Sequence, residues 1–308
     1  MSGDDVELMV RHRTTEIEGV KIFYREGGSP SAPAVLLLHG FPSSSFQFRY
    51  MLPVLADTYH VLAPDFPAFG FSECPVRSRY SYKFDHYADT IEAFTNKLGL
   101  AQYALYVHDY GAQVGFRLAL RSPERVAALV IQNSEASEDG RTQSWSAIED
   151  YWRDPSLLKR EALRQRLFTE KGIRSEFVEH LPPEIVELID PSTIALSWTH
   201  IRRPGVVEAL LDLHLDYQSN VVLYPRFQSY FRAHRPPAAH QQRLPRTSAI
   251  CQTPRSTSLM VVIGHLKATD RGSFNSRVSS SIGIAARVLP TCGLRNASSS
   301  SDSQRRQS

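Results

Sequence analysis

The sequence predicts an α/β fold in which a mostly parallel sheet is flanked by helices and interrupted by a helical insertion. Short apolar runs alternate in the first half of the chain with segments that favour helix, the pattern of a parallel sheet covered on both faces. Residues 140–230 look helical, with proline breaks. The 308 residues, 42% of them hydrophobic, can bury a sizeable core.

The predicted elements follow in order from the N-terminus. Residues 14–26 form an opening hairpin. The predicted buried strands, each apolar or β-branched, are residues 34–38, 60–63, 103–107 and 127–132. The helices between them include residues 87–98 and 113–120.

The change from strand 103–107 to helix 113–120 leaves Asp109 and Gly111 at an abrupt turn. A side chain at such an elbow projects from the backbone, and the free N–H groups of the helix start stabilise negative charge beside it. Asp109 is therefore a candidate nucleophile, although an aspartate at this position also suits a plain helix N-cap.

An aspartate at the elbow implies a different reaction class from serine, and no G-x-S-x-G motif occurs in the chain. A carboxylate is already ionised at neutral pH and can displace a leaving group at an sp3 carbon, which would form an alkyl ester of Asp109. Hydrolysis of that ester needs water, a base such as histidine, and donors for the developing oxyanion.

Two other strand ends converge on the same crevice. The strand at residues 34–38 leads into His39-Gly40-Phe41-Pro42, and the N–H groups of Phe41 and Tyr110 are the candidate oxyanion-hole donors. The strand at 60–63 leads into a turn-rich connection that ends at Ser72. We interpret His39 and His108 as structural, His39 because it adjoins the oxyanion loop and His108 because its side chain points away from that of Asp109.

These motifs over residues 15–236 resemble the α/β-hydrolase family, and within it the branch of epoxide hydrolases and haloalkane dehalogenases. The resemblance rests on H-G-x-P, then D-x-x-G-x-G-x-S, then an elbow of the form small-x-Asp-aromatic-Gly. Val107 and Ala68 stand where the family usually or often has glycine. Dehalogenases of this branch typically place tryptophan after the nucleophile, and this chain has Tyr110, which favours epoxide opening.

The resemblance also implies a helical cap over the crevice, here residues 140–236, which hold all three tryptophans. Cap phenols of epoxide hydrolases hydrogen-bond the epoxide oxygen. Tyr151, Tyr217 and Tyr224 are the candidates, with Tyr217 first, and the alternative for each is a core tyrosine with a satisfied hydroxyl. With Trp145 they would bind a small apolar substrate. The alternatives are a haloalkane dehalogenase or, in another class, a non-catalytic hydrolase-fold protein that binds a ligand or partner.

The sequence implies no cofactor and no metal, because it has neither a nucleotide-binding glycine loop nor a cluster with metal-ligand spacing. Cys74, Cys251 and Cys292 suggest neither zinc nor a disulfide framework. We also expect no membrane span and, since residues 1–7 lack the pattern of a secretory signal, a cytoplasmic location.

Residues 237–308 differ in composition from the hydrolase core at 1–139 and the helical region at 140–236. They hold ten Lys and Arg against two Asp, fourteen Ser and one aromatic residue, whereas residues 1–236 carry a net charge of −5. This composition predicts a poorly ordered tail. The resemblance implies further strands in this part of the chain, so we expect the sheet to lack the family's last strands, as a shifted reading frame or retained intervening sequence would produce. No nucleic-acid-binding motif accompanies the basic residues.

The position of the base is therefore open. Residues 259–263 could form a strand, and His265 follows Gly264 as the family's base follows a glycine. Asp270 comes after His265, the reverse of the usual order, so Glu135 or Asn133 is the alternative acid. A triad of Asp109, His265 and Glu135 is one hypothesis, and a protein without its base is the other.

Overall fold

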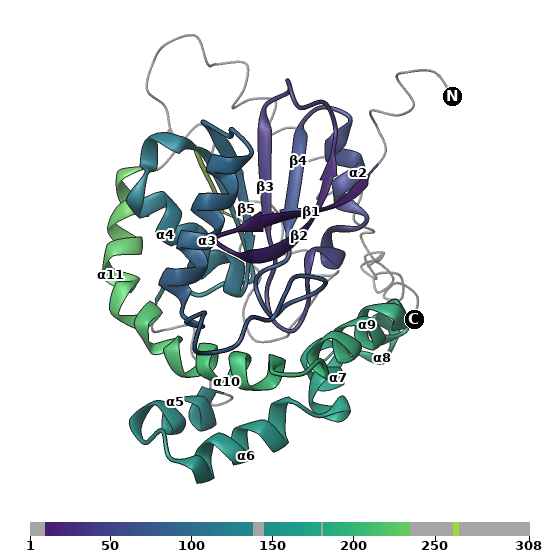
Figure 1. The fold of residues 1–308 in the computed structure, drawn as a ribbon, viewed down its shortest axis with the longest axis vertical. Helices are drawn as coiled ribbons and strands as arrows, with labels where there is room; N and C mark the ends of the chain where they lie inside the picture. The colour runs from purple at the N-terminus through teal and green to yellow at the C-terminus, as the bar shows by residue number, and fades with distance from the viewer. Residues whose placement is uncertain (1–9, 138–144, 180, 235–260, 265–308) are drawn as a thin grey trace, which may run out of the picture.

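The computed structural model describes residues 10–137, 145–179, 181–234 and 261–264, and it centres on a seven-stranded sheet of order β1-β2-β4-β3-β5-β6-β7 (Figure 1). The strands are β1 (Arg11–Ile17), β2 (Val20–Gly27), β3 (Ala34–Leu38), β4 (His60–Pro64), β5 (Tyr103–His108), β6 (Val126–Gln132) and β7 (Val261–Gly264). Strands β3 to β6 are parallel, and the β1–β2 hairpin joins them antiparallel through β4. The fold class and the predicted hairpin are confirmed.

The parallel strands are apolar throughout because both of their faces are covered. In β3, Val35 and Leu37 pack on one face against helix α2 (Met51–Ala56), while Leu36 and Leu38 belong to the larger core cluster on the other face. Two helices contribute to that larger cluster, α3 (Phe84–Lys97) and α4 (Tyr110–Arg121). Alternate residues of a strand point to opposite faces, so a continuous apolar run fills both layers.

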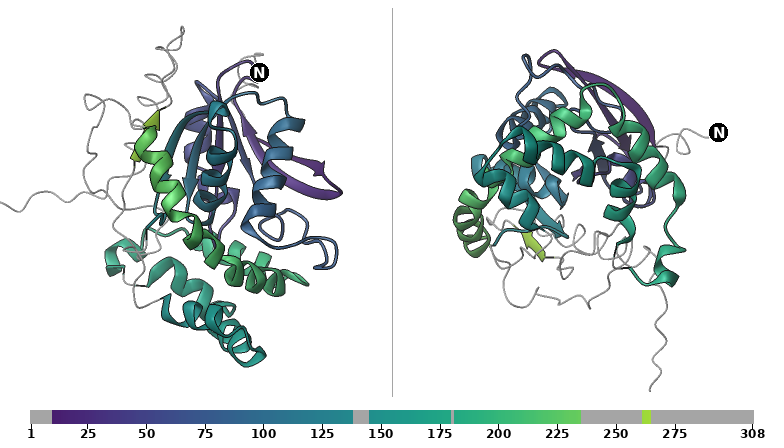
Figure 2. Two further views of the ribbon diagram at one scale, coloured as in Figure 1. Left: turned by 90° about the vertical axis from the view of Figure 1, so that its left-hand side faces the viewer. Right: turned by 90° about the horizontal axis from the view of Figure 1, so that it is seen from below.

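In the described residues, seven further helices follow β6. They are α5 (Ser146–Arg153), α6 (Leu157–Leu167), α7 (Glu170–Val178), α8 (Pro183–Val186), α9 (Pro191–Ile201), α10 (Val206–Asp216) and α11 (Gln218–Ala233). Helices α5 to α10 gather at one end of the sheet, and α11 runs back beside α4 (Figures 1 and 2). Arg160 and Arg164 of α6 both pair with Glu208 of α10, which ties two of these helices together. The predicted helical character of this region is confirmed.

The outer edge of β6 carries a strand from the region after residue 236. The sequence allowed a strand at residues 259–263 within a tail that otherwise lacks the family's last strands, and β7 pairs antiparallel with β6, in the register Ile131↔Val261 to Ala128↔Gly264. Its sequence, Val261-Val262-Ile263, is β-branched, which suits strand pairing. The predicted strand at 259–263 is thus found two residues later, and the remaining expectations for the tail lie outside the described residues. No helix in the described ranges is long and apolar enough to cross a membrane.

Candidate active site

Asp109 is the single residue between β5 and α4, and its backbone is strained. Its φ of 50° and ψ of −119° lie outside the regions that side-chain-bearing residues normally adopt. Such strain persists only where the surroundings fix it, and it concentrates at functional sites. The sharp turn directs the carboxylate toward the loop after β3, as the predicted elbow requires.

Two glycines permit the close approach of the elbow to β3. A Cβ added at Gly111 would lie 2.2 Å from the backbone oxygen of Leu38, and one at Gly40 would lie 2.4 Å from the Cβ of Asp109. Neither distance is compatible with a larger residue unless the backbone moves. Steric contact therefore explains why glycine occupies position 40, after His39, and position 111, after Tyr110.

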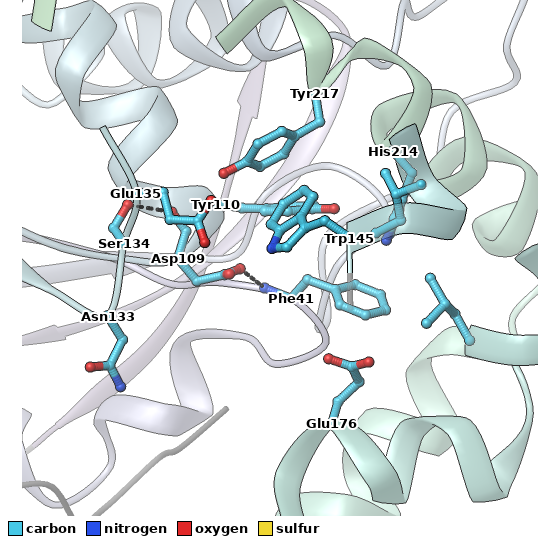
Figure 3. A pocket seen from close by; sticks show the side chains of 12 residues that line it. Phe41, Asp109, Tyr110, Asn133, Ser134, Glu135, Trp145, Glu176, His214 and Tyr217 are labelled. Carbon is cyan, nitrogen blue, oxygen red and sulfur yellow. Dashed lines mark hydrogen bonds between the residues drawn. The ribbon is translucent and has the colours of Figure 1, made fainter. Parts of the chain in front are cut away.

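The carboxylate of Asp109 accepts a hydrogen bond of 2.8 Å from the amide N–H of Phe41 to its Oδ1 atom (Figure 3). Asp109 also precedes the first turn of α4, where the helix dipole favours negative charge. Of the two predicted oxyanion donors, Phe41 is thus aimed at the carboxylate itself. Tyr110, the other, is the first residue of α4.

A cavity of about 60 Å³ opens in front of this elbow. Its walls include Phe41, Asp109, Tyr110, Glu135, Trp145 and Tyr217, and further side chains come from α7 and α10. Four of the twelve lining residues are aromatic and three are acidic, and the volume suits a few water-sized groups. The structure thus brings together Asp109, both predicted donor residues, Trp145 and Tyr217.

Tyr217 is at the junction of α10 and α11 and is almost fully buried. Its ring packs against Trp145, with centroids 4.7 Å apart, and against Trp152, 6.0 Å apart and nearly parallel. Its hydroxyl accepts a hydrogen bond from Nε2 of Gln113 at 3.4 Å and points to the side of the cavity that holds Asp109 and Glu135 (Figure 3). Burial raises the pKa of Tyr217 well above its ordinary value, so the phenol keeps its proton at neutral pH.

The other two candidate tyrosines do not line the cavity that the described residues form. Tyr151 is buried, and its hydroxyl accepts a hydrogen bond of 3.0 Å from Nη1 of Arg160, which directs it toward α6. Tyr224, on α11, is also buried and hydrogen-bonds Tyr217. Tyr151 thus has the satisfied hydroxyl of a core tyrosine, and Tyr224 can act on the cavity only through Tyr217.

His39 is hydrogen-bonded to the loop after β3, which fits the structural role predicted for it. Its Nε2 accepts a hydrogen bond of 3.1 Å from the backbone N–H of Phe66, so the proton of the neutral ring is on Nδ1, which lies 3.0 Å from the carbonyl oxygen of Gly40. Complete burial lowers its pKa to about 4, and burial likewise lowers that of His108 to about 4. Both rings are therefore neutral and embedded at physiological pH.

Two titratable cavity residues were missed by sequence reasoning, Glu176 of α7 and His214 of α10. Glu176 lies on the buried face of its helix beside Ile173 and Phe177, and an acidic residue within an apolar stripe is a signal that could have identified it. His214 donates from Nδ1 to the carbonyl oxygen of Leu210 at 2.8 Å, and its ring meets that of Phe41 edge to face, 5.0 Å away. No sequence pattern placed it near the elbow.

The loop after β6 brings the predicted alternative acids to the same cavity. Glu135 lines it, and its backbone oxygen accepts a hydrogen bond of 2.8 Å from Gln113 Nε2. Asn133, with a φ of 46°, also borders the cavity, but its side chain points away from the Asp109 carboxylate (Figure 3). His265 and Asp270 lie outside the described residues. Within the described part of the chain, no three His, Cys, Asp or Glu side chains form a group that could hold a metal ion.

Comparison with known proteins gives concordant matches. The family described as alpha/beta hydrolase fold matches residues 33–178. An uncharacterized hydrolase of Saccharomyces cerevisiae is 38% identical over 72% of this chain and 76% of its own length. A haloalkane dehalogenase of Mycobacterium marinum is 33% identical, over 44% of this chain and 48% of its own. The crystal structure of an epoxide hydrolase from Vigna radiata superposes with a TM-score of 0.55 and 26% identity, covering 71% of this chain and 76% of that chain.

Proposed function

Because the chain belongs to the α/β-hydrolase family, we propose that it is a hydrolase of the epoxide-hydrolase type, in which Asp109 attacks an sp3 carbon. The observation that carries the proposal is the hydrogen bond from Phe41 N–H to Asp109 Oδ1 at the rim of an aromatic cavity. The attacking atom in this proposal is the other carboxylate oxygen. The hydrogen bond also places a donor on the oxygen that becomes the ester carbonyl.

In the first step, the attacking oxygen of Asp109 forms a bond to one epoxide carbon, and the bond from that carbon to the ring oxygen breaks. The electron pair stays on the ring oxygen, which takes the phenolic proton of Tyr217. The raised pKa of Tyr217 supports this role, since only a protonated phenol can donate. The product is an alkyl ester of Asp109, which is a covalent intermediate.

In the second step, water adds to the ester carbonyl, and charge develops on the oxygen that Phe41 N–H already holds. A base must take the proton of that water. The ester bond between the Asp109 carbonyl carbon and the alkyl oxygen then breaks, and the departing alkoxide takes the proton from the base and leaves as the diol. The proton of the resulting Asp109 carboxyl group returns to the Tyr217 phenolate, which regenerates both groups. Glu135 lines the cavity, as the proposed triad with His265 requires, and His265 lies outside the described residues. Release of the diol therefore tests whether the chain supplies this base.

The test is intact-protein and peptide mass spectrometry after incubation with a small reactive epoxide, together with an assay for diol. An adduct on the peptide with Asp109 and steady diol release support the complete cycle. An adduct that accumulates without diol supports nucleophilic attack with a missing base. Neither an adduct nor diol from a panel of small epoxides and haloalkanes would contradict the proposal and favour a non-catalytic binding protein.

A second candidate function, dehalogenation, is favoured by Trp145. Its indole Nε1 is buried, lines the cavity on the side of Asp109 and has no hydrogen-bond partner among the described residues (Figure 3). A departing halide accepts hydrogen bonds, so this donor suits it. Halide release from small bromoalkanes, measured beside diol formation, decides between the two chemistries. The substrate we propose in either case is small and largely apolar, and the cytoplasm is the proposed location.

A further inference from the structure

Asp109, Gln113 and Arg117 are spaced four residues apart at the start of α4 and along it, so they follow one face of that helix. The first is the proposed nucleophile, and the other two contact the start of α11. Gln113 donates to the Tyr217 hydroxyl, and Arg117 reaches Ser219 and Asn220. One helix face thus connects the proposed nucleophile with the proposed proton donor.

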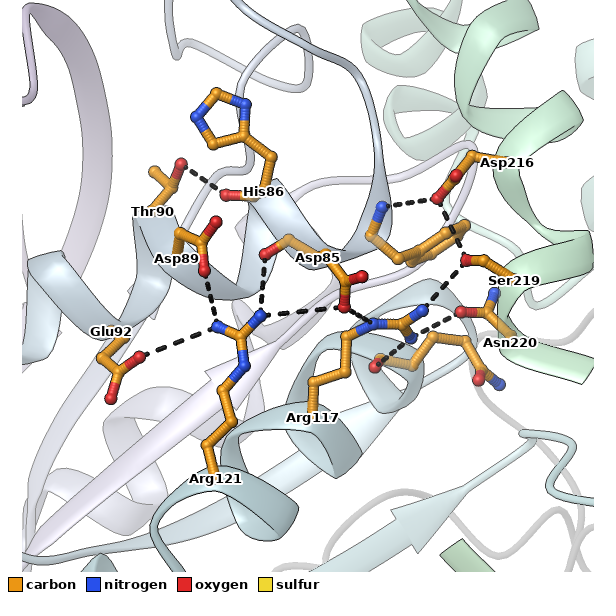
Figure 4. Close-up of polar contacts among 12 residues, drawn as sticks. Asp85, His86, Asp89, Thr90, Glu92, Arg117, Arg121, Asp216, Ser219 and Asn220 are labelled. Atoms are coloured by element: carbon orange, nitrogen blue, oxygen red, sulfur yellow. Dashed lines mark hydrogen bonds and ion pairs between the residues drawn. The ribbon is translucent and has the colours of Figure 1, made fainter. Parts of the chain in front are cut away.

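Arg117 is buried, with 2% of its side chain exposed, and each of its nitrogens is hydrogen-bonded (Figure 4). Nε donates to Asp85 Oδ1 at 2.7 Å, and Nη2 donates to Ser219 Oγ at 3.0 Å. Nη1 donates to Asn220 Oδ1 at 2.5 Å and to the carbonyl oxygen of Gln113 at 3.1 Å. A planar guanidinium makes such a set of bonds in fixed directions, which a lysine ammonium cannot reproduce.

The segment 216–220, which Arg117 contacts, spans the junction of α10 and α11 and depends on contacts from other elements for its orientation. Tyr217 is the point where α10 ends and α11 begins, so its orientation depends on side-chain contacts around it more than on either helix. Asp216 accepts hydrogen bonds from the Phe84 N–H at 2.9 Å and from the Ser219 hydroxyl at 3.2 Å. The guanidinium also lies 5.7 Å from the centre of the Phe84 ring, and that ring meets the ring of Tyr217 edge to face.

We propose that Arg117 is a positioning residue that fixes Tyr217 over Asp109, an inference that rests on the proposed roles of those two residues. Proton donation to the ring oxygen requires the phenol to stand at a set distance from the attacked carbon. A displacement of about 1 Å at a reacting group can cost about a hundredfold in rate. Arg117 is not among the described residues that line the cavity, so it acts on the cavity through the residues it holds, chiefly those of the segment 216–220.

Arg121 offers a matched control on the next turn of α4. It pairs with Asp89 and also approaches Asp85, and among the described residues it makes no hydrogen bond or ion pair with α11 (Figure 4). Arg121→Met therefore removes an arginine from the same helix without releasing Tyr217. Arg117→Lys keeps the charge and most of the volume, and it serves beside Arg117→Met in case the latter does not fold.

The kinetic test is a double-mutant cycle with Tyr217→Phe, read as the single-turnover rate of ester formation on Asp109 from a small epoxide. We expect Arg117→Met or Arg117→Lys to slow alkylation by about 10- to 100-fold when Tyr217 is present and by no more than about 2-fold in the Tyr217→Phe background. Arg121→Met stays within about 2-fold of the parent in both. An equal factor in both backgrounds, or no effect when Tyr217 is present, overturns the inference.

A second measurement separates this inference from the proposed function. Amide hydrogen exchange in residues 217–221 requires no catalysis, and we expect about tenfold faster exchange there in Arg117→Lys than in Arg121→Met, with β5 unchanged. Equal exchange in the two variants overturns the inference. If the parent protein forms no ester at all, the proposed function fails, while the exchange experiment still decides whether Arg117 holds Tyr217 in place.

Discussion

The amide N–H of Phe41 donates a 2.8 Å hydrogen bond to Oδ1 of Asp109, a residue 68 positions later in the chain. Phe41 belongs to the loop after β3, and Asp109 follows the adjacent parallel strand β5. The carboxyl ends of parallel neighbours lie at the same edge of a sheet, so strand pairing brings the two residues together. The bond orients the carboxylate before any substrate binds.

Asp109→Asn should abolish alkylation by epoxides while the protein stays folded. Asparagine tolerates positive φ nearly as well as aspartate, so the strained elbow is preserved, but its amide cannot act as the nucleophile. The measurement is adduct mass on the peptide that contains residue 109, with a thermal melt as the folding control. An adduct that forms at the parent rate would show that another side chain is the nucleophile.

Gly40→Ala should lower both activity and stability. The new Cβ would lie 2.4 Å from Asp109 Cβ and 2.6 Å from its Oδ1, so the carboxylate must move and lose its bond to Phe41. We expect about 1–3 kcal/mol of destabilisation from this overpacking, together with slow alkylation.

Gly99→Ala is the matched control for that change. Gly99, unlike Gly40, has a positive φ, +70°, and nothing lies within 4 Å of an added Cβ. This variant should lose about 1 kcal/mol through backbone strain and keep the alkylation rate of the parent. If Asp109 is alkylated equally fast in both glycine variants, contact with Asp109 does not explain why residue 40 is glycine.

Tyr217→Phe should separate the two candidate reactions. Epoxide opening requires a proton for the ring oxygen, and we expect its rate to fall about 100- to 1,000-fold without the phenol. Displacement of bromide requires no proton, so alkylation by a bromoalkane should change by less than about 10-fold. Parallel single-turnover assays on the two substrates measure this difference, and equal losses would argue against Tyr217 as a proton donor.

The acidic walls of the cavity should exclude anionic substrates. Asp109, Glu135 and Glu176 all line it, and no Lys or Arg is among the described lining residues. We expect kcat/KM for an epoxide bearing a carboxylate to be at least about 10-fold below that for its neutral amide. Glu176→Gln should narrow this difference, because it removes one negative charge at the wall that faces the substrate.

Stability should fall as the pH decreases from about 6.5 to about 4. Burial lowers the pKa values of His39 and His108 to about 4, whereas both rings titrate near 6.5 when unfolded. In this window the unfolded chain binds more protons than the folded protein. Each histidine therefore lowers the free energy of unfolding by up to about 1.4 kcal/mol for each unit by which the pH falls. Above pH 6.5 both rings are neutral in the folded and the unfolded state, so this loss of stability is absent.

Urea unfolding at several pH values measures that slope, and His108→Leu tests its origin. The variant removes one of the two buried rings, so its slope between pH 6.5 and 4 should be smaller than that of the parent, whatever its stability at neutral pH. An unchanged slope would assign the pH dependence to other groups.

The strands and the elbow could be predicted from sequence because their signals are local. An apolar run such as residues 34–38 and a glycine beside Asp109 reflect short-range geometry, and the structure has both where expected. Tyr217, the first of the predicted cap tyrosines, lines the cavity, whereas Tyr151 bonds to Arg160 instead. The sequence contains no local difference between these two tyrosines, because their roles depend on which helix faces which.

The sequence alone determined the fold class, the carboxylate at the strand–helix turn and the donor at Phe41, since steric limits on glycine and the periodicity of buried strands act over a few residues. Only the tertiary structure decided which side chains surround that carboxylate. Glu176 and His214 reach the cavity, and Arg117 reaches Ser219 and Asn220, through packing between helices that are far apart in the chain. Such contacts depend on the summed geometry of many elements, which no single stretch of sequence contains.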